Sequence, residues 1–313
     1  MADQTDVSAL VDRREWRTIA VAAGVYGGWF IALGAHRRMP APAVVGLLAW
    51  TGAWHLSLQH ETIHGHPFRD RRRGHALGWV PLTMWLPYEL YRVSHLAHHA
   101  SDLTNPADDP ESYYLDPDDY AAHGRLGRWI ADANRTLAFR LIVWSAIGTV
   151  GFVVSGMRDV VGGRRGARRT WAAHTVGAAA VLAMAVGVAG VPLWQYLLGA
   201  VYGARVLNLL RSFAEHRWVP GERSRSAMVE AGPLLSLLML NVNLHVTHHD
   251  RPGLAWYDLP AHARSDGAAR RAAAGAGYYP GGYAQLVRRY AFRRFDEPTH
   301  PPGGVRNPTP SSR

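Results

Sequence analysis

The sequence contains no cysteine and no lysine, and it is poor in charge. The lack of cysteine excludes disulfides, iron–sulfur clusters, thiolate zinc sites and a cysteine nucleophile. The lack of lysine excludes Schiff-base chemistry and the lysine of a P-loop. Charged residues make up 19% of the 313 residues, whereas soluble domains average about 25%. All 34 basic residues are therefore arginines, and the formal net charge is +10.

Long runs without charge predict membrane helices. Residues 18–35, 41–59 and 141–157 contain no Asp, Glu or Arg, and neither does the longer run 170–204. A single crossing needs about 20 apolar residues, so we expect the last run to form two helices with a turn near residues 190–192. The arginines flank these runs, an arrangement typical of membrane proteins rather than of nucleic-acid binding. The sequence therefore predicts an all-α integral membrane protein.

The positions of the arginines predict the orientation of the helices. Arginines precede the first run and follow the second, and both sets are expected on the cytosolic side (Arg13, Arg14, Arg17; Arg69, Arg71, Arg72, Arg73). Residues 158–169 hold five more arginines. We therefore predict that 141–157 dips into the cytosolic leaflet, which leaves four spans. The alternative is that 141–157 crosses the membrane and 192–213 dips instead.

Most of the 17 histidines fall into four groups. Two of them repeat the spacing HxxHH, one is HxxxH and one is a single histidine in SFAEHR: His60, His64; His95, His98, His99; His216; His245, His248, His249. On a helix, positions i and i+4 share a face, so each group can direct imidazoles toward one metal. Nine buried imidazoles without a metal would leave donors and acceptors unpaired. Nine nitrogens are too many for one tetrahedral zinc, which implies two metals, with iron, zinc or copper compatible.

Two other interpretations explain fewer of the grouped histidines. Residues 60–64 fit HExxH, in which Glu61 would be the general base of a zinc-dependent intramembrane protease. A protease of that kind needs one zinc and leaves both HxxHH groups and His216 without a role. A non-catalytic metal-binding membrane protein is the third interpretation. His55 and His174 are interpreted as core histidines.

Four segments together resemble the membrane fatty acid desaturase-like superfamily, which includes alkane hydroxylases and carotenoid ketolases and hydroxylases. They are HETIHGHP, HLAHHASDLTNPADDPESYY, RSFAEHR and LNVNLHVTHHDRPGLAWYDLP, and the resemblance covers about residues 15–290. It implies about four transmembrane helices with interfacial or dipping helices, under a cytosolic helical cap that carries the histidine boxes. It also implies two non-haem irons, with the nine grouped histidines as catalytic ligands: His60, His64, His95, His98, His99, His216, His245, His248 and His249.

The resemblance further implies an O2-dependent attack on an unactivated C–H bond of a lipid-like substrate. Fatty acyl desaturation is the favoured reaction, and hydroxylation or ketolation of an acyl, alkane or isoprenoid substrate is the alternative. The sequence has no flavin, nicotinamide or iron–sulfur motif, so a separate electron donor is expected, such as a ferredoxin with its reductase. His66 is a possible extra ligand, and Asn243, Asn241 or Asn208 a possible iron-linked asparagine, with Asn243 favoured.

Acidic residues beside the boxes are candidates to accept the second N–H of ligating imidazoles. Glu215 and Asp250 adjoin predicted ligands and are favoured, whereas the acidic stretch 108–119 fits a solvated surface equally well. Arg92 and Arg211 are candidates to hold an acidic headgroup or a phospholipid. Residues 1–296 are expected to form one membrane domain, and the Pro- and Gly-rich segment 297–313 is expected to be disordered.

Overall fold

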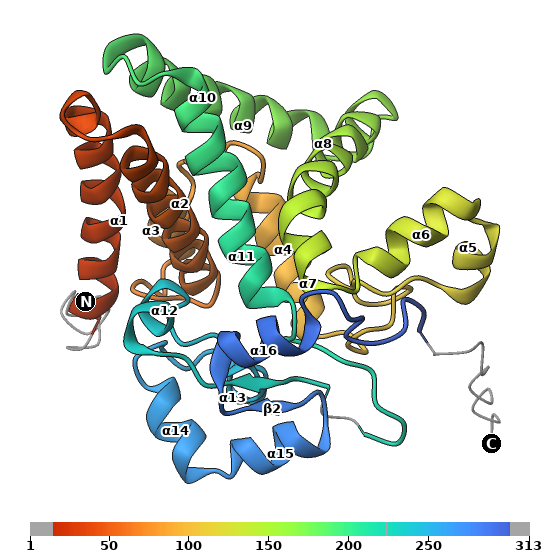
Figure 1. Cartoon of the computed structure of the whole chain (residues 1–313). Coiled ribbons are helices and arrows are strands. Elements are labelled where there is room, and N and C mark those ends of the chain that lie inside the picture. Colours follow the sequence, from red (N-terminus) through yellow and green to blue (C-terminus); the bar gives the residue numbers. More distant parts are fainter. Residues whose placement is uncertain (1–14, 223–224, 301–313) are drawn as a thin grey trace, which may run out of the picture.

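The computed structural model describes residues 15–222 and 225–300. The chain is mostly helical, and in the described residues its strands are two short segments, β1 (Met228–Val229) and β2 (Tyr278–Tyr279), which pair in parallel. The predicted all-α fold class is therefore confirmed. Long helices fill one end of the molecule, and short helices gather at the other (Figure 1).

The first two long helices form a hairpin. α1 (Trp16–Ala35) ends in a short 3-10 turn, η2 (His36–Arg38), and α2 (Ala41–Ile63) begins directly after Pro40. Pro42 stands in the first turn of α2, where its fixed φ suits the helix and its missing N–H has no intrahelical partner. Gly24 lies against the ring of Trp54, so a side chain there would collide with it. The hairpin places His60, near the carboxyl end of α2, beneath the apolar helices.

The other long helices form two further segments. α7 (Leu137–Phe139), the π-helical turn η3 (Arg140–Trp144) and α8 (Ser145–Val161) are continuous, as are α9 (Ala167–Leu182) and η4 (Ala183–Val188). After a turn at Gly190, whose φ is +78°, α10 (Leu193–Tyr196), η5 (Leu197–Gly203) and α11 (Ala204–Ser212) run back toward the short helices. The predicted division of 170–204 into two helices is therefore confirmed.

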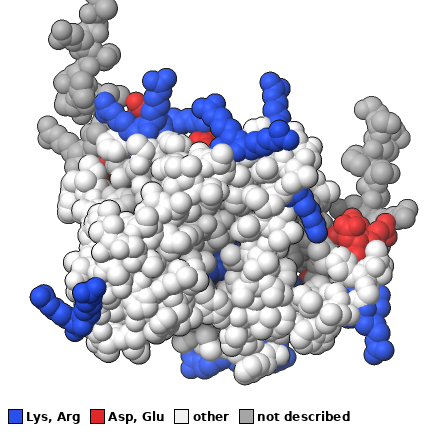
Figure 2. Space-filling model, turned by 90° about the horizontal axis from the view of Figure 1, so that it is seen from above, with Lys and Arg blue, Asp and Glu red and all other residues white. Residues whose placement is uncertain are grey.

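Within the part of the chain that the structure describes, four helices are long and apolar enough to cross a membrane: Trp16–Arg38, Ala41–Ile63, Leu137–Val161 and Ala167–Val188. Large apolar side chains on them face outward, including Ile31, Val150 and Val176, each more than 60% exposed. Figure 2 shows the upper end of the molecule, where uncharged side chains cover most of the surface and basic ones stand mainly at the rim. These features are those of a membrane protein. That 141–157 dips rather than crosses stays a prediction.

The short helices form a cap around the ends of α2 and α11. They come from the segment between α2 and α7 and from the segment after α11: α3 (Arg71–Gly78), α4 (Tyr88–His99), α5 (Pro117–Ala122), α6 (Arg125–Ala133), α12 (Pro233–Leu238), α13 (His245–Asp250), α14 (Leu259–Ser265), α15 (Ala268–Ala274) and α16 (Gly282–Tyr290). Leu115 bonds through its backbone to Pro298 and His300, so ordered structure continues past residue 297. Residues 301–313 of the expected disordered tail lie outside the described residues.

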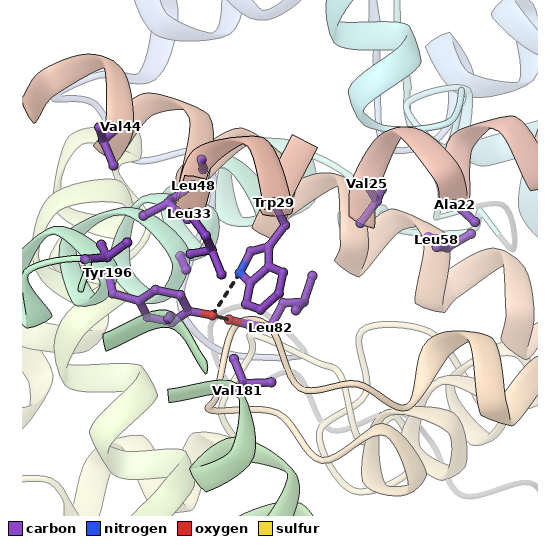
Figure 3. Close-up of a cluster of buried hydrophobic side chains, with 14 of the residues drawn as sticks. Ala22, Val25, Trp29, Leu33, Val44, Leu48, Leu58, Leu82, Val181 and Tyr196 are labelled. Atoms are coloured by element: carbon purple, nitrogen blue, oxygen red, sulfur yellow. Dashed lines mark hydrogen bonds between the residues drawn. The ribbon is translucent and has the colours of Figure 1, made fainter. Parts of the chain in front are cut away.

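A buried cluster joins α1, α2, α9 and α10 (Figure 3). Within it, the indole of Trp29 donates to the Tyr196 hydroxyl at 3.3 Å, and that hydroxyl donates to the carbonyl of Leu82 at 2.8 Å. Tyr196 is fully buried, so both bonds are shielded from water. They connect the hairpin, the returning helix and the loop before α4.

We expect Tyr196→Phe to destabilise the fold by about 1–3 kcal/mol, because the buried Trp29 N–H and Leu82 carbonyl lose their partner. Thermal unfolding in detergent measures this effect. Tyr202→Phe is the control, since the Tyr202 hydroxyl also donates to a carbonyl, that of Ile142, but from an exposed position. An equal loss of stability in the two variants would contradict a special role for the buried pair.

Candidate metal centre

The structure brings all nine grouped histidines together in two clusters, and within each cluster the possible ligand atoms lie within 4.8 Å of one another. They come from the end of α2, from α4, from the chain after α11 and from α13. Cluster 1 contains His60, His64, His95, His99 and His248, and cluster 2 contains His98, His216, His245 and His249. His55 and His174 belong to neither: His55 packs on Tyr26, and His174 Nε2 lies 2.9 Å from the carbonyl of Met84.

Each HxxHH helix contributes to both clusters. In α4, the i and i+4 histidines, His95 and His99, belong to cluster 1, while His98 belongs to cluster 2. In α13 the assignment is reversed, because His245 and His249 belong to cluster 2 and His248 to cluster 1. Positions i and i+4 share a helix face, whereas i+3 lies to one side of it. Helices α4 and α13 therefore lie between the two clusters and join them into one site.

The imidazoles meet through their Nε2 atoms. In cluster 1, His95 Nε2 lies 3.0 Å from His64 Nε2 and 3.1 Å from His99 Nε2. In cluster 2, His216 Nε2 lies 3.0 Å from His98 Nε2 and 2.9 Å from His245 Nε2. The donor atoms of histidines from distant parts of the chain thus converge on two points.

The hydrogen-bond partners of Nδ1 determine whether Nε2 of the same ring carries a proton. The Nδ1 atoms of His95, His98 and His245 face Glu111 Oε2 at 3.2 Å, Asp109 Oδ1 at 2.7 Å and the carbonyl of Val242 at 3.2 Å. Carboxylates and carbonyls accept hydrogen bonds, so each Nδ1 carries the proton and, in a neutral imidazole, Nε2 keeps its lone pair. Lone pairs that face one another in a buried site require a cation between them.

Burial keeps most of these imidazoles neutral. It lowers the pKa of His64 to about 2 and that of His99 to about 3, and the neighbouring histidines add to the effect. The pKa values of His216 and of the three α13 histidines, His245, His248 and His249, fall well below the ordinary value for the same reasons. His98 differs: burial lowers its pKa, but the hydrogen bond to Asp109 and the nearby negative charges of Glu111, Asp109 and Glu215 together outweigh burial, and the net shift is upward.

Several ring nitrogens in the clusters have no hydrogen-bond partner. Both ring nitrogens of His60 and the Nε2 of His249 are buried and make no hydrogen bond. A buried unpaired polar atom costs about 1–3 kcal/mol, so such atoms are rare in a folded protein unless an ion satisfies them. An all-imidazole donor set suits iron, zinc or copper. The residues of both clusters therefore fit metal ions as ligands.

A family model described as Fatty acid desaturase matches residues 38–280, a span that contains all nine clustered histidines. The chain belongs to the fatty acid desaturase family. No curated protein matches it. Family membership makes this desaturase-family chain an oxidoreductase of the desaturase and hydroxylase type, and the order of its histidine segments agrees with the resemblance seen in the sequence.

The acidic and amide residues around the clusters of this desaturase-family chain take different positions. Glu215 is partly buried, with Oε1 3.1 Å from Arg211 Nε and 3.7 Å from His245 Nδ1. Asn243 is 3% exposed; its amide N–H donates to the carbonyl of Val229, and its Oδ1 is buried without a partner. Asp250 is 44% exposed and pairs with Arg271 at 2.8 Å. Cofactor-binding roles for these three residues stay predictions.

Asp109 and Glu111 contact the clusters, although the acidic stretch that contains them was equally consistent with a solvated surface. Asp109 is 3% exposed and holds His98, and Glu111 holds His95. Burial opposes ionisation of Glu111, but His95, His98 and the hydroxyl of Ser94 together outweigh burial and lower the pKa of Glu111 to about 2. In the sequence, little distinguishes these two residues from surface acids. Asp109 simply follows Asp108 and precedes a proline in a stretch that contains several acidic residues.

His66 lies outside both clusters and holds three segments together. Its Nδ1 lies 2.5 Å from Glu15 Oε1 and its Nε2 lies 3.2 Å from the carbonyl of Gly253. Because both partners are acceptors, both ring nitrogens carry protons. Burial lowers the pKa of His66, but the Glu15 hydrogen bond and Glu61 outweigh burial and raise it. A doubly protonated imidazole has no lone pair for a metal.

We therefore expect His66→Gln to keep the full metal content of the wild-type protein while lowering its melting temperature, because the links from α1 to the loops after α2 and α13 weaken. Elemental analysis of the purified protein and thermal unfolding measure the two effects. His75→Gln is the control, since His75 is a surface histidine that pairs with Glu89 at 3.3 Å. Loss of metal from the His66 variant would identify His66 as a ligand.

Proposed function

We propose that this chain is a membrane-bound non-haem di-iron oxidoreductase that uses O2 to desaturate a fatty acyl chain. The observation that carries the proposal is the convergence of nine histidine side chains into two adjacent clusters in a member of the fatty acid desaturase family. The ligands would be the five histidines of cluster 1 and the four of cluster 2. When bound, the two irons supply the activation of O2 needed to attack an unactivated C–H bond.

The chain itself provides a place for the substrate beside cluster 2. A cavity of about 580 Å³ has His98 and His216 in its wall, and its volume lies within the range of about 300–1,000 Å³ found for small-molecule sites. Apolar side chains of the loop before α4 and of α8 line another part of it: Trp85, Leu86, Ile147 and Phe152. An acyl segment in this cavity would be sheltered from water, with one part adjacent to the histidines.

The carboxylates fix the ligating rings rather than the substrate. Asp109 and Glu111 hold the Nδ1–H groups of His98 and His95, which orients these rings and leaves each Nε2 free to bind a metal. Glu61 lies near cluster 1 but holds no ring: its Oε1 is 3.5 Å from His60 Nδ1, which has no hydrogen-bond partner, and its Oε2 accepts the backbone N–H of Trp256. With Oε2 bound to this backbone N–H, Glu61 is poorly placed to serve as the general base of an HExxH protease.

The histidine clusters are proposed to face the cytosol. They lie at the end of α2, and the arginines at 69 and 71–73 follow this end directly, as expected for a cytosolic segment. Reducing equivalents would come from a separate ferredoxin-like donor with its reductase, because the sequence has no motif for a redox cofactor of its own. An acidic donor would be attracted to the arginine-rich cytosolic surface.

Lipid and metabolite profiling of cells with and without the gene tests the reaction. We expect a product two hydrogens lighter than its precursor in the cells that express the wild-type chain and not in cells that express His98→Ala. A product one oxygen heavier would instead show hydroxylation by the same metal centre. Metal analysis of the purified protein distinguishes the oxidoreductase from a zinc-dependent intramembrane protease. Two irons per chain support the oxidoreductase. A single zinc per chain, with proteolysis retained in His98→Ala, would support the protease.

A further inference from the structure

The wall of the cavity beside cluster 2 contains several arginines, of which Arg135, Arg140 and Arg211 are buried and Arg205 is partly buried. Four arginines line it, and all four lie beside or within the helices that run from the apolar end toward the histidines: Arg135, Arg140, Arg205 and Arg211. Guanidinium groups stay protonated in proteins, so each one taken out of water requires a compensating charge or hydrogen bonds. The partners of the four arginines therefore show whether the cavity is complete without a ligand.

Two of the four arginines have acidic partners in the chain. Arg135 forms an ion pair with Asp296, which also accepts the Tyr114 hydroxyl. Arg211 Nε lies 3.1 Å from Glu215 Oε1. Their charges are therefore balanced by residues that the structure already places next to them.

Arg140 and Arg205 have no such partner. Within residues 15–222 and 225–300, no carboxylate oxygen lies within 4.0 Å of either guanidinium. Arg140 is 1% exposed; its Nε donates to the carbonyl of Asn134, but its Nη2 is buried without a hydrogen bond. The Nε of Arg205 is likewise buried and unpaired. Both guanidinium groups line the cavity.

Aromatic rings position these two guanidinium groups without neutralising them. Arg140 lies over the ring of Tyr113 with its Cζ 4.2 Å from the centroid, and Arg205 lies over Trp85 at 4.4 Å. A cation–π contact contributes about 0.5–2 kcal/mol, less than the cost of several kcal/mol for burying an uncompensated charge. Stacking also fixes the plane of a guanidinium, which favours a bidentate bond to a planar or tetrahedral anion.

The remaining carboxylates of the wall are already engaged. Asp109 holds His98, and Glu111 holds His95 and the hydroxyl of Ser94. No acidic side chain of the wall is left to turn toward Arg140 or Arg205. Two positive charges without an acidic partner, one buried and one partly buried, thus line a cavity of ligand size whose wall also contains apolar side chains.

We propose that the cavity binds an anionic amphiphile, whose carboxylate or phosphate group is held between Arg140 and Arg205 while its apolar chain extends along Trp85 and Phe152. This proposal rests on the proposed function, since it names the class of substrate for that site. It excludes a neutral hydrocarbon or isoprenoid as the preferred ligand. It also replaces Arg92 and Arg211 as the residues that hold an acidic group, because these pair with Glu89 and Glu215.

Binding of three matched probes to the purified full-length protein in neutral detergent tests the proposal. Dodecanoate, dodecyl phosphate and the neutral methyl dodecanoate share one apolar chain, and tryptophan fluorescence reports binding because Trp85 lies in the wall. We expect at least one anion to bind the wild type about tenfold to a hundredfold more tightly than the ester, the range for charge-assisted hydrogen bonds. Arg140→Gln and Arg205→Gln should each remove most of this preference.

Arg164→Gln is the matched control, since Arg164 is a 75% exposed arginine beyond the end of α8. The Arg140 variant should also melt no lower than the wild type without ligand, because it removes an unpaired buried charge. A preference for dodecanoate assigns the site to a fatty acid carboxylate, and a preference for dodecyl phosphate assigns it to a lipid phosphate. Equal binding of all three probes, or a preference that survives in both glutamine variants, would overturn the proposal. The assay needs neither iron nor O2, so its result is independent of the proposed reaction.

Discussion

His98→Ala is expected to abolish turnover and to lower the bound metal from two ions to one per chain. Cluster 2 has four imidazoles, and His98 Nε2 lies 3.0 Å from His216 Nε2 within it. The variant leaves three imidazoles and an empty volume, and it also leaves Asp109 without the N–H that it accepts at 2.7 Å. Because the two clusters would act on one substrate together, loss of one metal removes the reaction rather than half of it.

Elemental analysis and product mass, measured on the same preparation, test this expectation. His123→Ala is the control. His123 is an exposed histidine whose Nδ1 contacts the carbonyl of Asp119, and it belongs to neither cluster. His98→Asn is a second variant that keeps a polar side chain at this position. If it is monodisperse and melts at the wild-type temperature, misfolding cannot explain its loss of metal and activity. Two metals and full activity in the alanine variant would remove His98 from the centre.

The set of nine histidines was predictable from the sequence, and their division between the clusters was not. Helical spacing shows that His95 and His99 share a face, which depends only on local geometry. Which face of α4 meets which face of α13 depends on tertiary packing. The exchange that places His98 with His245, and His248 with His95, is therefore visible only in the structure.

The turn near residue 190 was predictable because a run of 35 apolar residues exceeds one crossing, and because glycine and proline interrupt it. Gly190 has a φ of +78°, and Pro192 directly precedes the next helix. The partners of the ligands were harder to predict. Asp250 adjoins a histidine in sequence but lies on the outward side of α13, paired with Arg271, whereas Asp109, eleven residues from His98, folds back onto it. Closeness in sequence is a poor guide where a loop returns to a helix.

Arg140 and Arg205 show a similar limit. In the sequence each flanks an apolar run, where arginine usually reaches toward the membrane surface. In the structure the guanidinium of Arg140 turns inward instead, to 1% exposure beside Tyr113 and Phe213. Only the packing of α8 against α11 distinguishes an arginine that faces lipid headgroups from one that faces a cavity.

Asp109→Asn is expected to weaken metal binding in cluster 2 by about 10–100-fold, the usual effect of losing a residue that orients a ligating histidine. Asp109 Oδ1 accepts from His98 Nδ1 and from the backbone N–H of Glu111, and Oδ2 accepts from the backbone N–H of Thr104. An asparagine has one acceptor oxygen, so its NH2 group must face another donor on one side. The side chain then either releases His98 or displaces the loop at Thr104.

Metal titration of the apoprotein measures this loss, and it should appear in one of the two binding steps because the residue contacts cluster 2 alone. Asp108→Asn is the matched control: it makes the same chemical change one residue away, where the carboxylate accepts the backbone N–H of Asp102 on the surface and contacts no clustered histidine in the described residues. Equal affinities in the two variants would mean that the charge of the acidic stretch matters rather than the Asp109–His98 bond. A loss confined to Asp109→Asn, with the second step unchanged, would show that this buried carboxylate positions one ligand of one metal.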